Sequence, residues 1–169
     1  TELANFLRAK EVLFVLDGFD HLLDAATWLG QLLHHAPNVK LLVTSRERLN
    51  LQREWLVAVE GLAYPSGAGI AEAHHFSAVQ LFIERARQVQ ADFELNAATQ
   101  ACVARVCQLV DGMPLGIELA AAWAQTHSCD EIAREIERGY AFLATTQRDA
   151  PERQRSLRAV FDHSYALLS

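Results

Sequence analysis

A short apolar run that stops on a carboxylate is the feature that most constrains this fold. Residues 12–16 read Val-Leu-Phe-Val-Leu, Asp17 follows directly, and Asp20 adds a second carboxylate. Buried strands of parallel sheets read as continuous apolar runs, and ligands bind at their carboxyl ends. The run therefore predicts a strand of a parallel sheet, with two carboxylates at the edge where ligands bind.

The neighbouring segments extend this prediction to a strand–helix–strand unit. Residues 2–9 predict a short helix, residues 22–35 carry apolar side chains at helical spacing, and residues 40–44 form a second apolar run. Short loops between these segments imply a right-handed crossover and a parallel pair. Residues 54–59 are a candidate for a third strand.

Beyond residue 74 the pattern is helical only. We expect helices at 76–90, 97–110, 114–124 and 128–139, with a last helix after a polar stretch at 145–155. Gly112 is the expected left-handed cap of the second of these, and Pro114 suits the first turn of the third. Ser128, with Glu131 three residues later, predicts a capped start for the fourth.

The bulk composition excludes several classes. About half of the 169 residues (51%) are apolar, which favours a packed core over disorder, and the net charge of −6 argues against nucleic acid or an anionic membrane as a direct partner. No apolar run reaches the roughly 18 residues of a membrane span, and no signal peptide is evident. We therefore expect a cytoplasmic location and no membrane partner.

Cysteine and methionine usage give two more expectations. The three cysteines form no zinc-like pattern, and their odd number argues against a disulfide framework, so Cys102 and Cys107 are expected in the core. The chain begins at Thr1 and has its only methionine at Met113, so we expect it to be a piece of a longer protein.

Two carboxylates are the first candidate site residues. Asp17 can be a magnesium ligand, directly or through water, or it can cap the following helix. Asp20 can orient or deprotonate a water, or it can be a solvated acid favoured by the helix dipole. A small metal-dependent hydrolase built on this pair alone lacks further ligands.

Arg46 and Pro114 are the other two candidates. Arg46 follows the second predicted strand, so its guanidinium belongs to the same sheet edge as Asp17 and can read a terminal phosphate, unless it is an ordinary surface arginine. Pro114 can offer an apolar plate to a flat base, although its place at a helix start already explains it. A G-x-x-x-x-G-K-[ST] loop to hold phosphates is absent from the sequence.

In family order, these segments resemble the nucleotide-binding module of STAND-class ATPases. The similarity is to the NB-ARC-like branch in bacterial multidomain transcriptional regulators of the LuxR/MalT and AfsR/SARP type. Residues 13–22 resemble its Walker B string, residues 41–49 its sensor-1 strand and residues 78–86 the first helix of its helical subdomain. Residues 111–121 are similar to its "GLPL" segment, and residues 153–168 to the first helix of the winged-helix domain that follows.

The resemblance implies a role for each candidate. Asp17 would coordinate magnesium, Asp20 would occupy the catalytic acid position, Arg46 would sense the γ-phosphate and Pro114 would contact adenine. Two residues depart from the family pattern: Gly18 replaces a polar residue, and Asp20 replaces the usual glutamate, which is one methylene longer. General-base geometry depends on such reach, so hydrolysis is expected to be slow.

The same resemblance implies a fold and a domain plan. The fold class would be α/β followed by all-α: a partial P-loop NTPase parallel sheet, a helical subdomain and the start of a winged helix. Residues 1–63 would be the C-terminal part of the nucleotide-binding domain and residues 64–75 a linker. Residues 76–144 would be the helical subdomain, and residues 145–169 a linker with the first winged-helix element.

The family's phosphate-binding loop would precede residue 1, and this has consequences for partners. The parent protein would bind Mg²⁺ with ATP or ADP and act as a slow ATPase, whereas the isolated chain is expected to be inactive with no cofactor bound. Loss of the first strand would expose sheet edges and faces, so either residues 54–59 are displaced or a second copy fills the gap by self-association.

Two functions follow from these expectations. The first is a fragment of an ATP/ADP-binding signal-transduction switch from a bacterial transcriptional regulator, partnered by adjacent winged-helix and effector domains and making no nucleic acid contact itself. The alternative is a nucleotide-independent helical protein-interaction module with a decayed ATPase remnant, which Gly18 and the absent phosphate loop favour.

Overall fold

The computed structural model of this chain describes residues 2–144 and 156–157. The chain divides into two compact units, Thr1–Ala58 and Val59–Ser169. Each unit has its own hydrophobic clusters, and the two are described separately below.

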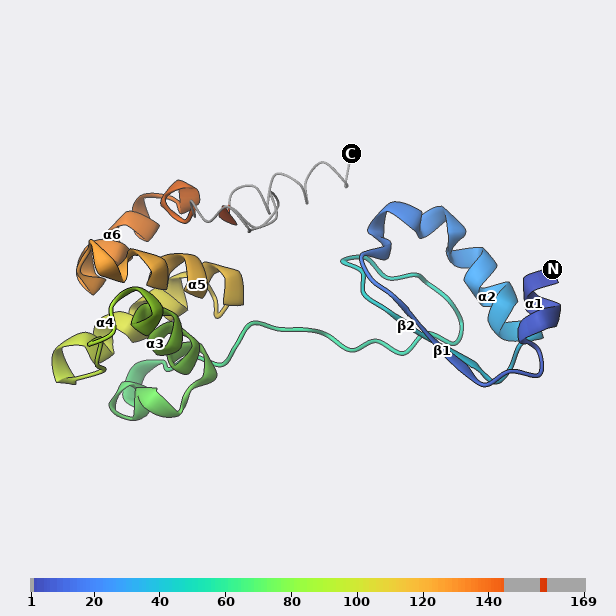
Figure 1. Ribbon diagram of the computed structural model, residues 1–169, viewed down its shortest axis with the longest axis horizontal. Coiled ribbons are helices and arrows are strands. Elements are labelled where there is room, and N and C mark those ends of the chain that lie inside the picture. The colour runs from blue at the N-terminus through green and yellow to red at the C-terminus, as the bar shows by residue number, and fades with distance from the viewer. Residues whose placement is uncertain (1, 145–155, 158–169) are drawn as a thin grey trace. The chain divides into compact units, whose positions relative to one another are not determined.

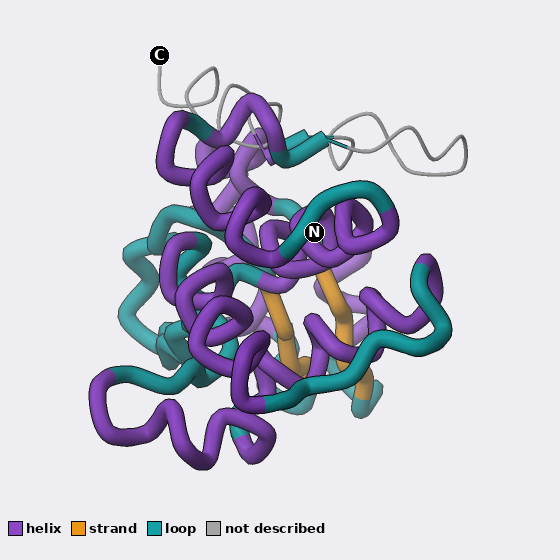
Figure 2. The backbone as a smooth tube through the Cα atoms, turned by 90° about the vertical axis from the view of Figure 1, so that its left-hand side faces the viewer, coloured by secondary structure: helices purple, strands orange, loops and turns teal. Residues whose placement is uncertain are grey.

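The first unit is a strand–helix–strand arrangement preceded by a short helix. Its elements are helix α1 (Glu2–Leu7), strand β1 (Val12–Leu16), the 3₁₀ segment η1 (Phe19–Ala25), helix α2 (Ala26–His35) and strand β2 (Val39–Val43) (Figure 1). The two strands run parallel and side by side, with Val12 opposite Val39 and Leu16 opposite Val43 (Figure 2). The predicted strands and their parallel pairing are confirmed.

Only one face of this sheet is covered. Leu29 and Leu32 of α2 are buried in clusters that include the inward side chains of both strands. On the other face Leu13, Val15 and Leu42 are 59%, 61% and 56% exposed. Parallel sheets usually carry helices on both faces. This apolar face, by contrast, has no covering helix among the described residues.

The predicted P-loop NTPase sheet is wrong for this structure. Across the described residues the chain is mostly helical, and its sheet has two strands only, β1 and β2. The physical reason lies in residues 54–59, the candidate third strand. Their apolar run fits a buried strand, but a strand also needs a hydrogen-bonded neighbour.

Residues 54–59 have no such neighbour in the described chain and form no regular element. Trp55, Val57 and Val59 are 94%, 86% and 95% exposed. The segment is thus unpaired in the described chain, and the choice between displacement and self-association stays open. The apolar run identified a segment that can become a strand, but it could not supply the partner.

The second unit is helical. Its elements are the 3₁₀ segment η2 (Gly67–His75), helices α3 (Ser77–Val89), α4 (Ala97–Leu109) and α5 (Pro114–Ala122), the 3₁₀ turn η3 (Trp123–Gln125), helix α6 (Cys129–Arg138) and the 3₁₀ turn η4 (Tyr140–Phe142). The four predicted helices are confirmed within a few residues. The predicted linker at 64–75 contains η2, and most of the predicted winged-helix segment lies outside the described residues.

Helix α3 packs on α5 and helix α4 packs on α6 (Figure 1). Their shared core is fully buried and contains Val79, Phe82, Val103, Val106, Ile117 and Ile132. Each helix contributes residues three or four positions apart, which lie on one helical face. The apolar spacing in the sequence therefore predicted the helices that build this core, although Ala101, which it placed on the apolar face of α4, is exposed.

Backbone capping fixes where these helices begin and end. The side chain of Ser128 accepts from the N–H of Glu131, and the Glu131 carboxylate accepts from the N–H of Ser128, so the predicted cap of α6 is confirmed. Asn96 and Thr99 form the equivalent reciprocal pair at α4. Gly112 has φ +65°, the left-handed conformation expected after α4.

The expectation that cysteine pairing is absent was wrong. Cys102 of α4 and Cys129 of α6 form a disulfide, while Cys107 is free and buried. Spacing in the sequence gave no sign of this bond, because the two cysteines meet only once α4 packs on α6. An odd cysteine count is compatible with one bond and one free thiol.

Candidate functional site

The carboxyl ends of β1 and β2 bring three of the predicted side chains to one edge. Leu16 pairs with Val43, so Asp17 and Thr44 follow at the same level of the sheet. Asp20 lies in η1 and Arg46 follows β2, within the same connection region. The prediction that these residues share one sheet edge depends on parallel pairing, and the structure provides that pairing.

Asp17 is tied to the neighbouring strand through Thr44. The Thr44 hydroxyl donates to Asp17 Oδ1 at 2.6 Å and accepts from the N–H of Gly18 at 2.8 Å. These bonds accompany two backbone bonds at the same edge, in which the N–H of Thr44 donates to the carbonyl of Leu16 and the N–H of Phe19 donates to the carbonyl of Thr44. Asp17 is exposed, and its Oδ2 makes no hydrogen bond within the described residues.

Thr44 is a site residue that sequence reasoning missed. A hydroxyl residue directly after the second strand, at the register position opposite Asp17, was the available signal. Its importance depends on register, because a shift of one residue would turn its side chain to the other face. Gly18 has φ +66° and nothing within 4 Å of an added Cβ, so the left-handed backbone of the turn into η1, and not a lack of space, favours glycine there.

Asp20 holds the two strand ends together. Its Oδ1 accepts from the N–H of Arg46 at 2.6 Å and from the Ser45 hydroxyl at 3.3 Å. The backbone bond from Arg46 is the largest cause of a pKa below the ordinary carboxyl value. A carboxylate with a lowered pKa is a weak base at neutral pH, so this geometry favours a positioning role over proton abstraction. The catalytic role of Asp20 stays a prediction.

Arg46 contributes its backbone and its charge to this edge. The N–H binds Asp20, and the positive guanidinium further lowers the pKa of Asp20. The side chain is exposed, and its guanidinium donates no hydrogen bond within the described residues. An arginine in this state can bind an anionic group bidentately.

Pro114 belongs to the second unit and starts α5. Met113 is the extended residue before the helix and Pro114 its first residue, a position that needs no backbone N–H donor. The exposed ring follows a tight turn at Gly112. The carbonyl of Gly112 accepts at 2.8 Å from the N–H of Leu62, which lies on the segment that enters this unit. The helix start explains the proline, and contact with a base stays a prediction.

The same turn is held by a side-chain bond. The Tyr64 hydroxyl donates to Asp111 Oδ1 at 2.8 Å, and this bond raises the pKa of Tyr64. A Cβ added to Gly112 would overlap the carbonyl oxygen of Leu62, so only glycine permits this approach of two backbones. The segment that enters the second unit is therefore fixed against the start of α5.

Within the described residues, histidine, cysteine, aspartate and glutamate form no group of three that could hold a metal ion. In that part of the chain Asp17 therefore does not belong to a ligand cluster of the size that structural metal sites require. Magnesium sites on nucleotides commonly use one or two carboxylates and complete the shell with phosphate and water.

None of the helices in the described residues is long and apolar enough to cross a membrane.

Comparison with known proteins gives relatives that are much longer than this chain. It is 36% identical over 168 residues, 99% of its length, to a protein of Mycobacterium bovis provisionally named an HTH-type transcriptional regulator, of which it spans 18%. A protein of Mycobacterium tuberculosis H37Rv with the same provisional name matches equally, and an uncharacterized protein of that strain matches over 40% of its length. These names agree with the expected regulatory context.

No family model matches the chain, and no solved structure matches it.

Proposed function

We propose that this chain is part of a transcriptional regulator and that the carboxyl edge of β1 and β2 provides one side of a site for a magnesium-bound ATP or ADP. The observation that carries the proposal is the presence, at one sheet edge, of an exposed carboxylate and of a guanidinium without a hydrogen bond among the described residues. Asp17 has a free Oδ2, and Arg46 has a guanidinium with no hydrogen bond among the described residues.

These two groups are suited to opposite parts of a magnesium–phosphate complex. A carboxylate oxygen binds Mg²⁺ directly or through its water shell, and a guanidinium binds phosphate oxygens. Thr44 holds the Asp17 carboxylate, and Asp20 holds the backbone from which the Arg46 side chain extends, so the edge is partly prepared for a ligand. Preparation of this kind reduces the entropy lost on binding.

The site is weak by itself. Most phosphate affinity in nucleotide sites comes from backbone N–H groups of a glycine-rich loop and its lysine, and this sequence has no such loop. We therefore expect millimolar affinity at best and no hydrolysis by the 169-residue chain. The relatives that are named as regulators support the regulatory part of the proposal.

Titration of the ¹⁵N-labelled chain by NMR tests this function, since the method detects millimolar binding. With Mg²⁺ and ADP or ATP, we expect saturable shifts of the amide signals of Gly18, Thr44 and Arg46. Asp17→Asn keeps an oxygen that accepts from Thr44 but removes the charge, so the magnesium-dependent part of the shift should disappear.

Asp24→Asn is the matched control, because Asp24 is an exposed acid of the same 3₁₀ segment and makes none of these bonds. Its titration should resemble that of the unaltered chain. Absence of edge shifts at 10 mM nucleotide, or shifts of equal size in Asp17→Asn, contradicts the nucleotide proposal.

The second candidate is a nucleotide-independent protein-interaction module. It is favoured by the use of Asp20, whose Oδ1 is already bound by Arg46 and Ser45 to hold the strands together. It is favoured also by the self-contained core of the helical unit. A titration without edge shifts, in a chain that retains dispersed amide signals, supports this candidate.

A further inference from the structure

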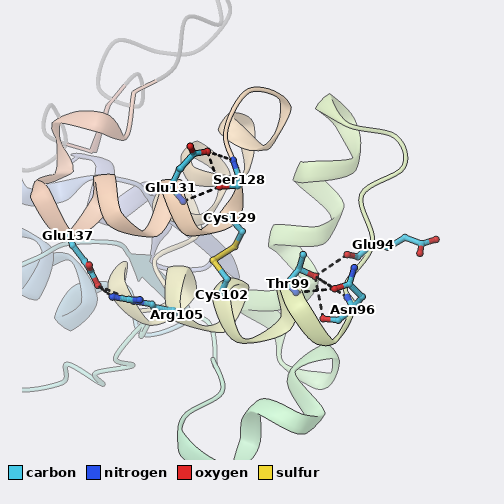
Figure 3. The surroundings of a disulfide bond; sticks show 9 residues. All are labelled: Glu94, Asn96, Thr99, Cys102, Arg105, Ser128, Cys129, Glu131 and Glu137. Atoms are coloured by element: carbon cyan, nitrogen blue, oxygen red, sulfur yellow. Dashed lines mark hydrogen bonds and ion pairs between the residues drawn. A yellow bond between two sulfur atoms is a disulfide. The ribbon is translucent and has the colours of Figure 1, made fainter.

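Two helices of the second unit are joined covalently near their starts. Cys102 lies in the second turn of α4, Cys129 is the first residue of α6, and their sulfurs form a disulfide (Figure 3). Their Cα atoms are 5.9 Å apart, inside the range that a disulfide spans without backbone movement. The packing of α4 on α6 therefore already places both sulfurs for bonding.

We propose that Cys102 and Cys129 form a reversible thiol–disulfide site that responds to low-molecular-weight thiols and disulfides. The key observation is the difference in exposure between the two residues. Cys102 is 6% exposed, whereas Cys129 at the start of α6 is only half-buried. Exchange requires in-line approach of a thiolate to a sulfur, so an accessible cysteine makes a disulfide labile where a fully buried pair resists attack.

The position of Cys129 also affects its thiol form. The N–H groups in the first turn of a helix stabilise a nearby thiolate. Asp130 and Glu131 in the same turn oppose this effect by their charge, although hydrogen bonds with Ser128 hold the Glu131 carboxylate. Exposure, rather than helix position, therefore decides that Cys129 is the residue that exchanges with small molecules.

The exchange balances with a small disulfide as the oxidant. The Cys129 thiolate attacks one sulfur of a disulfide RSSR, an S–S bond forms between Cys129 and that RS group, the S–S bond of RSSR breaks, and RS⁻ leaves. The thiolate of Cys102 then attacks the Cys129 sulfur and expels the second RS⁻. Two cysteine thiols lose two protons and two electrons in total, and RSSR is reduced to two RS⁻; excess thiol reverses both steps.

The unit is built to remain folded in both states. The contact of α4 with α6 is also held by the buried Val106 and Ile132, and by an ion pair between Arg105 and Glu137 (Figure 3). None of these interactions involves a sulfur atom, so we expect them to remain when the disulfide is reduced. The disulfide joins two residues with a sequence separation of 27 and so closes a loop. Its formation mainly restricts the unfolded chain and thereby stabilises the helical unit.

Thiol counting across a redox series tests the proposal on the folded chain. The protein is equilibrated with mixtures of reduced and oxidised glutathione, quenched with acid, unfolded and alkylated for mass spectrometry. We expect one two-electron transition, from three alkylated cysteines to one, with a Cys129–glutathione adduct during the approach to equilibrium.

Two outcomes overturn it. Three free thiols in fully oxidised glutathione show that no exchangeable pair exists. A disulfide that survives large excess of reduced glutathione under native conditions shows a structural bond that small thiols do not reach.

Substitutions separate this pair from the third cysteine. Oxidation should raise the Tm of the unaltered chain by about 10 °C. Cys129→Ala should remove the redox dependence of Tm. Cys107→Ala should retain this dependence, even if the loss of a buried side chain lowers the Tm of both its oxidised and its reduced form. If Cys129→Ala fails to fold, Cys102→Ala provides the same comparison. A redox-dependent Tm that survives loss of Cys129, or that is lost with Cys107, contradicts the assignment.

Discussion

A carboxylate oxygen of Asp20 accepts a 2.6 Å hydrogen bond from the backbone N–H of Arg46, which lies 26 residues further along the chain. The bond joins the segments that leave β1 and β2, one strand to the other. It gives Asp20 a defined part in the first unit whether or not a ligand binds there. It also makes the charge of Asp20 matter for stability.

The pKa of Asp20 leads to a prediction about acid. Because the folded state holds this pKa below the ordinary value of 3.8, the charged carboxylate stabilises the first unit above that pH. The contribution is lost as pH falls through the lowered pKa. The ¹³C signal of the Asp20 carboxyl should titrate below pH 3.8.

Asp20→Asn should lower the urea midpoint of the first unit at pH 7, and the difference from the unaltered chain should shrink as pH falls below 4. The midpoint can be followed by the amide signals of Gly18 and Gly30. A difference that stays constant across this pH range would contradict a stabilising role for the charge.

Gly112 should tolerate no side chain. Gly112→Ala combines a left-handed φ of +65° with overlap between the new Cβ and the carbonyl of Leu62. We expect about 3 kcal/mol or more of destabilisation, measured by urea unfolding and circular dichroism. Gly67→Ala is the matched control, because Gly67 has φ +54° with open space around it, and only the left-handed penalty of about 1 kcal/mol is expected. Equal effects of the two substitutions would show that the contact with Leu62 is absent.

The start of α6 depends on its cap. Ser128→Ala removes the oxygen that accepts from the N–H of Glu131 and should cost about 1 kcal/mol of unfolding free energy. Ser77→Ala at the start of α3 serves for comparison, since Phe76 occupies that cap position and makes no side-chain cap bond. Its effect should stay within about 0.5 kcal/mol. Thermal unfolding under oxidising conditions measures both, with the disulfide intact.

Cys107 should be chemically inert in the folded chain. Burial raises the pKa of its thiol from 9.0 to about 12, so at pH 8 the reactive thiolate falls by about a thousandfold. In the oxidised protein, where Cys107 is the free thiol, reaction with a chromogenic disulfide should be slower by at least that factor than in urea. Rapid labelling without denaturant would contradict the burial of this side chain.

The strands, the main helices and most helix starts could be predicted from the sequence, because each rests on local chemistry. The run at 12–16 fits a buried strand, the spacing within α3 and α4 fits one helical face, and Ser128 with Glu131 is a local cap. The sheet edge shared by Asp17 and Arg46 also followed, since parallel strands of similar length end together.

The predicted sheet failed at a non-local step. Residues 54–59 have the apolar run of a buried strand, but only a neighbouring backbone could have made them one. The partners of Asp20 and Thr44 depend likewise on strand register, which no single segment specifies.

By itself the sequence determined the two paired strands, the four main helices of the second unit, and which carboxylates stand at the strand ends. Only the tertiary structure decided that Thr44 fixes Asp17, that Asp20 binds the backbone of Arg46, and that Cys102 meets Cys129. The physical reason is range. Helix periodicity, capping and turn geometry act within a few residues, whereas these contacts join groups that only chain packing brings together.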